Sequence, residues 1–98
     1  MDRLPDKKIV IIGGTTGIGL SAARAFIAEG AKVVVVGRSK DSVEQAGNEL
    51  GKNGQAICGD ATDPNTASSA IELCLQEFRG FDGLYHVAGG SGRKMGDG

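Results

Sequence analysis

The chain has 98 residues, enough for one small domain with a modest core. Eleven lysines and arginines nearly balance twelve aspartates and glutamates, so net charge predicts neither a nucleic-acid partner nor an anionic membrane surface. The apolar run from Ile9 to Ile12 is too short for a signal peptide or a membrane span, and we therefore expect a soluble, cytoplasmic protein.

Short apolar runs rich in β-branched residues alternate with stretches of helical periodicity. The run Ile9–Ile12 predicts a strand buried on both faces. A helix is predicted from Ile18 to Glu29, with Gly30 as its stop. Its expected apolar face consists of Ile18, Ala22, Ala25 and Phe26.

The next two strands are predicted at Val33–Val36 and, more weakly, at Gln55–Cys58. Between them, residues 40–50 predict a helix with Ser39 as its N-cap. The expected apolar face of that helix consists of Val43, Ala46 and Leu50.

Asp63-Pro64 marks the start of a third helix, because an N-cap acceptor precedes a proline at the first helical position. Gly80 is its predicted stop, and Leu84–Val87 is predicted as a fourth strand. The expected apolar stripe of this helix consists of Ala67, Ala70, Ile71, Cys74, Leu75 and Phe78.

The resulting order, β-α-β-α-β-α-β, predicts parallel strands joined by right-handed crossovers, with residues 1–90 as the N-terminal part of one domain. In the usual strand order 3-2-1-4, the apolar fourth strand would be an unpaired edge. Residues 91–98 are glycine-rich and predict a loop that leads into an absent C-terminal part. A natural truncation that pairs with itself or with a partner is the alternative.

A glycine-rich turn lies between the first strand and the first helix. Three glycines at this spacing are a weak signal in a chain with 17 glycines, but the strand-turn-helix setting is what a dinucleotide diphosphate site requires. Gly13 allows a sharp turn, Gly17 a close approach of the diphosphate, and Gly19 close packing of the helix, whose N-terminus attracts anions. Thr15 and Thr16 offer hydroxyl donors; a plain strand-to-helix turn is the alternative. The predicted binding segment is Gly13, Gly14, Thr15, Thr16, Gly17, Ile18 and Gly19.

This turn resembles the Thr-Gly-x-x-x-Gly-x-Gly motif of the short-chain dehydrogenase/reductase family, with Ile12 in place of the threonine. The stretch from Ala25 to Val34 is also similar to the family's first helix and second strand. The resemblance extends over essentially the whole chain. It implies a Rossmann-like, doubly wound parallel sheet in a three-layer αβα arrangement, a nicotinamide cofactor and hydride transfer between nicotinamide and a carbonyl or alcohol substrate.

Two further matches come from the resemblance. Asp60-Ala61 matches the pair that contacts the adenine ring, and Ala88-Gly89 matches the end of the family's Asn-Asn-Ala-Gly segment, which contacts the cofactor ribose. Here His86 and Val87 replace the two asparagines, so the sheet-stabilising and proton-relay roles of those asparagines do not carry over.

The residues at the end of the second predicted strand favour NADP(H), with NAD(H) as the alternative. An NAD site usually has a carboxylate there for the ribose hydroxyls, but this chain has Gly37 followed by Arg38. A guanidinium at this position binds a 2′-phosphate by charge-assisted hydrogen bonds, with Ser39 and Lys40 as possible helpers. A solvated loop charge is the alternative interpretation of Arg38.

No catalytic residue is predicted in these 98 residues. The family uses a serine and a Tyr-x-x-x-Lys pair, but the only tyrosine here is Tyr85, with Gly89 four residues later. We expect Tyr85 to be a packing residue. His86, the only histidine, is expected to be hydrogen-bonded near the cofactor, with proton transfer as the alternative.

The sequence therefore predicts the cofactor-binding portion of an NADP(H)-dependent oxidoreductase, inactive as 98 residues alone. A non-catalytic dinucleotide sensor or scaffold is the main alternative, and a nucleotide-sugar or methyl-donor enzyme is a weaker one. A small-molecule substrate and homo-oligomerisation are expected only of the complete protein. No metal site is predicted, because one histidine and two scattered cysteines, Cys58 and Cys74, form no ligand cluster; both are expected to be reduced core thiols.

Overall fold

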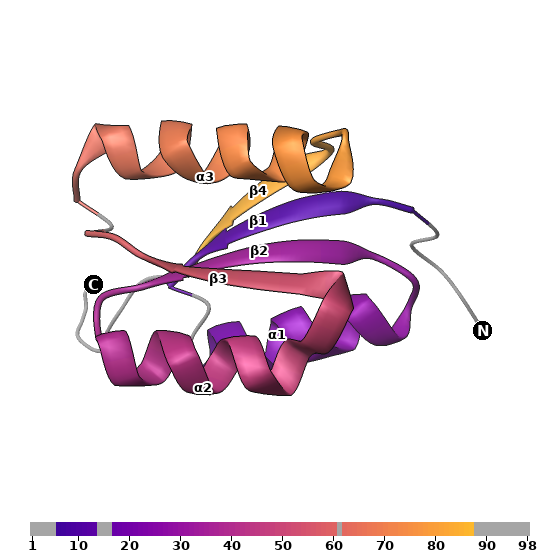
Figure 1. The fold of residues 1–98 in the computed structure, drawn as a ribbon, viewed down its shortest axis with the longest axis horizontal. Coiled ribbons are helices and arrows are strands. Elements are labelled where there is room, and N and C mark those ends of the chain that lie inside the picture. Colours follow the sequence, from indigo (N-terminus) through magenta and orange to yellow (C-terminus); the bar gives the residue numbers. More distant parts are fainter. Residues whose placement is uncertain (1–5, 14–16, 61, 88–98) are drawn as a thin grey trace.

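The computed structural model describes residues 6–13, 17–60 and 62–87 (Figure 1). The predicted loop at residues 91–98 therefore lies outside the described residues. The strands are β1 (Lys8–Ile12), β2 (Lys32–Gly37), β3 (Gly54–Cys58) and β4 (Gly83–His86). The helices are α1 (Gly17–Ala28), α2 (Lys40–Leu50) and α3 (Pro64–Phe78), with a short 3₁₀ turn at Gly51–Asn53.

The four strands form one parallel sheet in the order β3-β2-β1-β4. Helices α1 and α2 cover one face and α3 covers the other, which gives three layers (Figure 1). The predicted doubly wound αβα sheet and its strand order are therefore confirmed. Each strand is shifted or extended by only one or two residues from its prediction, and α2 has the predicted bounds.

The continuous apolar runs of β1 and β2 are buried on both faces, as predicted. Successive side chains of a strand point to opposite faces, so each strand supplies both cores. Toward α1 and α2 the core contains Ile9, Ile11, Val33 and Val35 together with Ala23, Ala46 and Leu50. Toward α3 it contains Val10, Ile12, Val34 and Val36 together with Ala70 and Cys74.

Two of the predicted helix faces are partly wrong. In α1, Ile18 is 81% exposed and Ala25 is also exposed, whereas Gly19 and Ala23 are buried. The helix packs through its smallest residues, which allow its backbone to approach the sheet closely, and the inward face is therefore rotated by one position. In α3, the predicted Ala70 and Cys74 are buried against the sheet, whereas the predicted Leu75 is half exposed.

The helix caps follow the sequence closely. The Ser39 hydroxyl accepts a hydrogen bond from Ser42 N–H at 3.4 Å, and the Asp63 carboxylate accepts one from Asn65 N–H at 2.9 Å. At the end of α3, Arg79 rather than Gly80 takes the left-handed conformation, with φ of 63°. Both predicted N-caps are therefore confirmed, and the C-cap of α3 lies one residue before the predicted glycine.

Candidate functional site

The carboxyl ends of all four strands lie at one edge of the sheet. The chain leaves β1 toward α1 on one face, while β4 is reached from α3 on the opposite face (Figure 1). The strand order therefore reverses between β1 and β4, and in open α/β sheets ligands bind outside the carboxyl ends at such a switch point. The glycine turn starts at this point, directly after Ile12.

Gly13 is required by the local backbone. Its φ is 90°, its N–H donates to the Val36 carbonyl at 2.7 Å, and a Cβ added to it would lie 2.8 Å from the Val87 carbonyl oxygen. A side chain at this position would thus collide with the chain leaving β4, in addition to straining the turn. Gly13 consequently permits close packing of two strand ends as well as the predicted sharp turn.

Gly17 begins α1 with a φ of 56°, and an added Cβ would have no neighbour within 4 Å. The space beside the helix N-terminus is therefore open on this side, next to the exposed Ile18, while Gly19 is buried. The helix N-terminus offers free N–H groups and partial positive charge to an anion. The remaining predicted members of this segment, Gly14, Thr15 and Thr16, lie outside the described residues.

Arg38 lies at the same edge, immediately after the buried Gly37 that ends β2, and its side chain is exposed. The next residue, Ser39, uses its hydroxyl oxygen to cap α2. Its hydroxyl hydrogen remains able to donate to a ligand, since the cap uses only the oxygen as acceptor. The end of β2 therefore presents a cation and a hydroxyl donor to solvent.

Asp60 follows β3 at this edge, and its carboxylate forms a tight local turn. One oxygen, Oδ1, accepts hydrogen bonds from Thr62 N–H at 2.9 Å and from the Thr62 hydroxyl at 2.7 Å. These two bonds lower the pKa of Asp60, and the positive charge of Arg38 lowers it further. Asp60 is thus charged at neutral pH; Ala61, Ala88 and Gly89 lie outside the described residues.

A cavity of about 200 Å³ lies between α3 and the carboxyl ends of β1 and β4. Its walls are mainly apolar, and the exposed His86 lies on one side of it. His86 is therefore near the strand ends, as predicted, in contact with a hollow that the sequence did not predict. The helix-start residues Asp63 and Pro64 were the one sequence signal for it, because they place the N-terminus of α3 beside these strands. The full lining is Ile12, Thr62, Asp63, Pro64, Ala67, Leu84 and His86.

Tyr85 points to the opposite face of β4, where its ring packs edge-on against Phe26 with centroids 5.1 Å apart. The predicted packing role is confirmed, although Tyr85 is 52% exposed because β4 has only one neighbouring strand among the described residues.

Cys74 is a buried free thiol, as predicted. Cys58 is free but exposed at the end of β3, so its assignment to the core was wrong.

Within the described ranges, no three or more histidine, cysteine, aspartate or glutamate side chains gather in a way that could hold a metal ion. Over the same ranges, no helix is both long and apolar enough to span a membrane.

The comparisons with known proteins agree with this architecture. Residues 7–97 match the family model described as short chain dehydrogenase. An oxidoreductase from Sarocladium schorii is 44% identical over 63 residues, which cover 64% of this chain and 25% of that protein. An uncharacterized oxidoreductase from Staphylococcus aureus (strain MRSA252) is 34% identical over 90 residues, which cover 91% of this chain and 39% of that protein.

Among solved structures, the chain is similar to a 3-ketoacyl-(acyl-carrier-protein) reductase from Brucella melitensis, crystallised in complex with NADH. The TM-score is 0.76 at 33% identity, over 83% of this chain and 34% of that one. The chain thus spans less than two fifths of the length of these relatives. Because the family model matches nearly the whole length of this chain, the chain belongs to the short-chain dehydrogenase family.

Proposed function

We propose that this chain binds NADP(H) at the carboxyl edge of its sheet, as the cofactor-binding portion of an oxidoreductase. The observation that carries the proposal is the exposed Arg38, directly after the buried Gly37 at the end of β2. An acidic residue at this position would repel a 2′-phosphate, whereas a guanidinium binds it with up to two parallel hydrogen bonds.

The other residues at the edge fit a dinucleotide. The open space at Gly17 and the N-terminus of α1 suit a diphosphate, and the exposed Ile18 offers apolar surface next to it. Asp60 presents an ionised carboxylate at the end of β3, where a purine amino group would find an acceptor. The similar reductase from Brucella melitensis was crystallised with NADH, which supports a nicotinamide dinucleotide as the ligand class.

A bound nicotinamide cofactor supplies or accepts the hydride in chemistry of this type. The residues of this chain contribute binding and orientation of the cofactor. The glycine turn holds the diphosphate, and Arg38 binds the 2′-phosphorylated ribose in preference to the unphosphorylated one. We propose that the substrate is a small carbonyl or alcohol compound in the complete protein. Proton transfer needs a positioned acid or base, and the only tyrosine, Tyr85, has no lysine four residues later and packs against Phe26.

For this reason we propose that the 98 residues alone bind cofactor without turning it over. A non-catalytic sensor or scaffold shares this property, and the catalytic serine and Tyr-x-x-x-Lys in a complete protein would distinguish the enzyme from the sensor. Oxidation of NADPH above background by the purified 98-residue chain, in the presence of carbonyl substrates, would contradict the proposed inactivity.

Titration of the chain with NADPH, followed by nucleotide fluorescence, tests the binding proposal. We expect saturable binding that Gly17→Val weakens by about tenfold or more, because the valine side chain enters the space proposed for the diphosphate and strains the positive φ. Glu49→Gln, on the exposed surface of α2, is the control and should leave binding unchanged. Absence of saturable binding of both NADPH and NADH would overturn the proposal.

A further inference from the structure

Arg38 and Asp60 leave the sheet side by side. Strands β2 and β3 are paired in parallel with Gly37 opposite Cys58, and Gly59 N–H donates to the Gly37 carbonyl at 2.9 Å. This bond fixes the two chain segments together at the residue before Arg38 and the residue before Asp60. Their charges therefore lie at neighbouring positions on the carboxyl edge.

The backbone before Asp60 has little freedom to move away. A Cβ added to Gly59 would lie 2.8 Å from Cγ2 of Thr66 and 3.1 Å from Cγ1 of Val36. Thr66 is buried in the first turn of α3, so this glycine is held between that helix and β2. The position of the Asp60 backbone is consequently restrained by the packing of Gly59 against α3 and β2.

The Asp60 side chain is directed by its own turn and not by Arg38. Its Oδ1 atom accepts both the N–H and the hydroxyl of Thr62, and neither of these hydrogen bonds involves Oδ2. Among the described contacts the carboxylate forms no ion pair with Arg38. A phosphate bound by Arg38 would thus meet a fixed negative charge nearby that the guanidinium does not neutralise by contact.

We propose that Asp60 is a specificity-determining residue, whose charge weakens binding of the 2′-phosphorylated ribose at Arg38 and so brings the affinities for NADP(H) and NAD(H) closer together. This inference rests on the proposed function. Two like charges at neighbouring positions on an exposed edge repel each other modestly in water, and the repulsion is screened within about 10 Å at 0.1 M salt. The expected effect is therefore small, salt-dependent and specific to the phosphorylated cofactor.

Asp60→Asn tests the proposal, because asparagine keeps the acceptor for Thr62 N–H while it removes the charge. The dissociation constants of NADPH and NADH are measured for both proteins at low ionic strength, about 0.01 M, and at about 1 M. At low ionic strength we expect the ratio of the Kd of NADPH to the Kd of NADH to fall about two- to fivefold, because loss of the proposed purine contact changes both constants alike. At high ionic strength this ratio should be the same in the two proteins.

Asp63→Asn is the matched control. Asp63 is also exposed and also accepts a backbone N–H two residues later, but it caps α3 and lines the cavity beside His86. This substitution should change the ratio of the two constants less than Asp60→Asn does.

Three outcomes would overturn the inference. An unchanged ratio in Asp60→Asn would show that the charge does not reach the phosphate. Equal weakening of both cofactors at both ionic strengths would show that Asp60 acts on the adenosine that they share. If the unsubstituted chain binds neither nucleotide, the proposed function fails as well, which separates that failure from the first two.

Discussion

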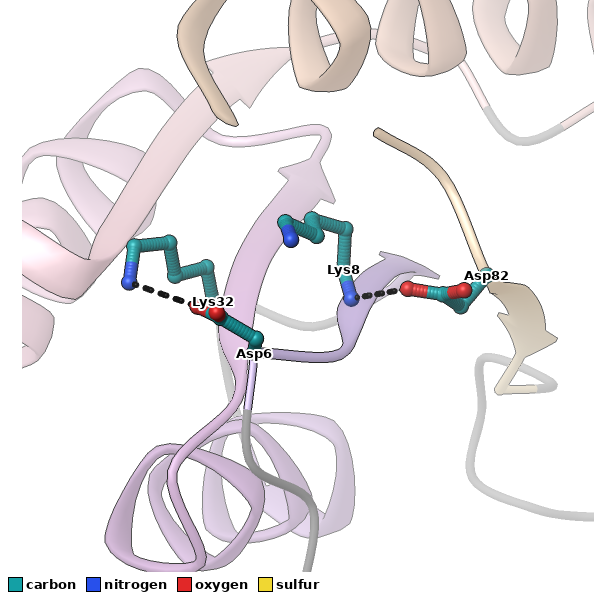
Figure 2. Close-up of polar contacts among 4 residues, drawn as sticks. All are labelled: Asp6, Lys8, Lys32 and Asp82. Atoms are coloured by element: carbon teal, nitrogen blue, oxygen red, sulfur yellow. Dashed lines mark hydrogen bonds and ion pairs between the residues drawn. The ribbon is translucent and has the colours of Figure 1, made fainter. Parts of the chain in front are cut away.

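Two hydrogen bonds join Lys8 of β1 to Asp82, and Figure 2 shows the one that the Asp82 carboxylate accepts. Lys8 N–H donates to the Asp82 carboxylate at 2.8 Å, and Asp82 N–H donates to the Lys8 carbonyl at 2.7 Å. Asp82 precedes β4, so this pair sets the start of β4 against β1. These two hydrogen bonds lie at the amino edge of the sheet, opposite the candidate site. They hold β4 in the register with β1 that places Val87 against Gly13.

Asp82→Ala should lower the free energy of unfolding by about 1 kcal/mol, because the amide of Lys8 loses a charged acceptor at a partly exposed position. Asp82→Asn retains an oxygen acceptor and should cost less. The nearby 3.7 Å ion pair between Lys32 and Asp6 (Figure 2), in which the Asp6 side chain is largely exposed, provides the comparison: Asp6→Ala should cost less than about 0.5 kcal/mol. Urea unfolding measures the free energy of unfolding of all three variants. Equal losses for Asp82→Ala and Asp6→Ala would contradict the stabilising role of the Lys8–Asp82 hydrogen bonds.

Alanine substitutions at Gly13 and at Gly47 should change the stability of the fold in opposite directions. Gly13→Ala should destabilise the fold by about 2 kcal/mol or more, because the methyl group meets the Val87 carbonyl and the φ of 90° is unfavourable for alanine. Gly47→Ala, inside α2, should stabilise it by about 0.5–1 kcal/mol, because the added Cβ only reaches ordinary contact distance, 3.8 Å, from Ala56. Thermal unfolding gives both signs; a neutral Gly13→Ala would contradict the close approach of the two strand ends.

The two thiols should differ sharply in reactivity. Cys58 is exposed, whereas Cys74 is buried and donates to the Gly80 carbonyl at 3.2 Å. An aromatic disulfide reagent at neutral pH should titrate one thiol in the native chain and two in denaturant, and rapid reaction of both in the native chain would contradict the buried position. Cys58→Ser should remove the fast reaction and leave stability within about 0.5 kcal/mol.

Cys74 also predicts a dependence of stability on pH. Burial raises the pKa of its thiol above the ordinary value of 9.0, and the charge of Asp82 raises it further. The unfolded chain therefore loses this proton at a lower pH than the folded one. The stabilising contribution is complete below the ordinary value and declines as pH rises above it toward the folded pKa. Cys74→Ala should show a shallower loss of stability over this alkaline range, measured by urea unfolding; an identical slope would contradict this origin.

Much of the fold follows from local signals in the sequence. The β-branched runs at Ile9–Ile12 and Val33–Val36 specify central strands, and Ser39 and Asp63 mark helix starts that the structure confirms. The inward face of α1 was not predictable from hydrophobicity, because tertiary packing favours the small Gly19 and Ala23 over Ile18. Likewise, the exposure of Cys58 follows from its place at the end of an edge strand, which depends on strand order.

The positions of the candidate site residues were predictable where they depend on the backbone alone. Arg38 and Asp60 follow strand ends, and parallel strands bring such residues to one edge. The Thr62 hydrogen bonds to Asp60 and the cavity beside His86 needed three-dimensional geometry, since they join residues whose relation depends on loop conformation and helix placement. The predicted contacts of Gly14, Thr15, Thr16, Ala61, Ala88 and Gly89 lie outside the described residues and stay predictions.

We propose that Arg38 selects NADP(H) over NAD(H), and Arg38→Ala tests this proposal most directly. Fluorescence titrations compare the dissociation constants of NADPH and NADH for the chain and the variant, with the exposed Lys52→Ala as a control for loss of a remote positive charge. We expect the Kd of NADPH to rise about tenfold or more in Arg38→Ala, which corresponds to about 1.4 kcal/mol for a charge-assisted contact, while that of NADH changes less than about twofold. Equal changes for both cofactors would contradict the account.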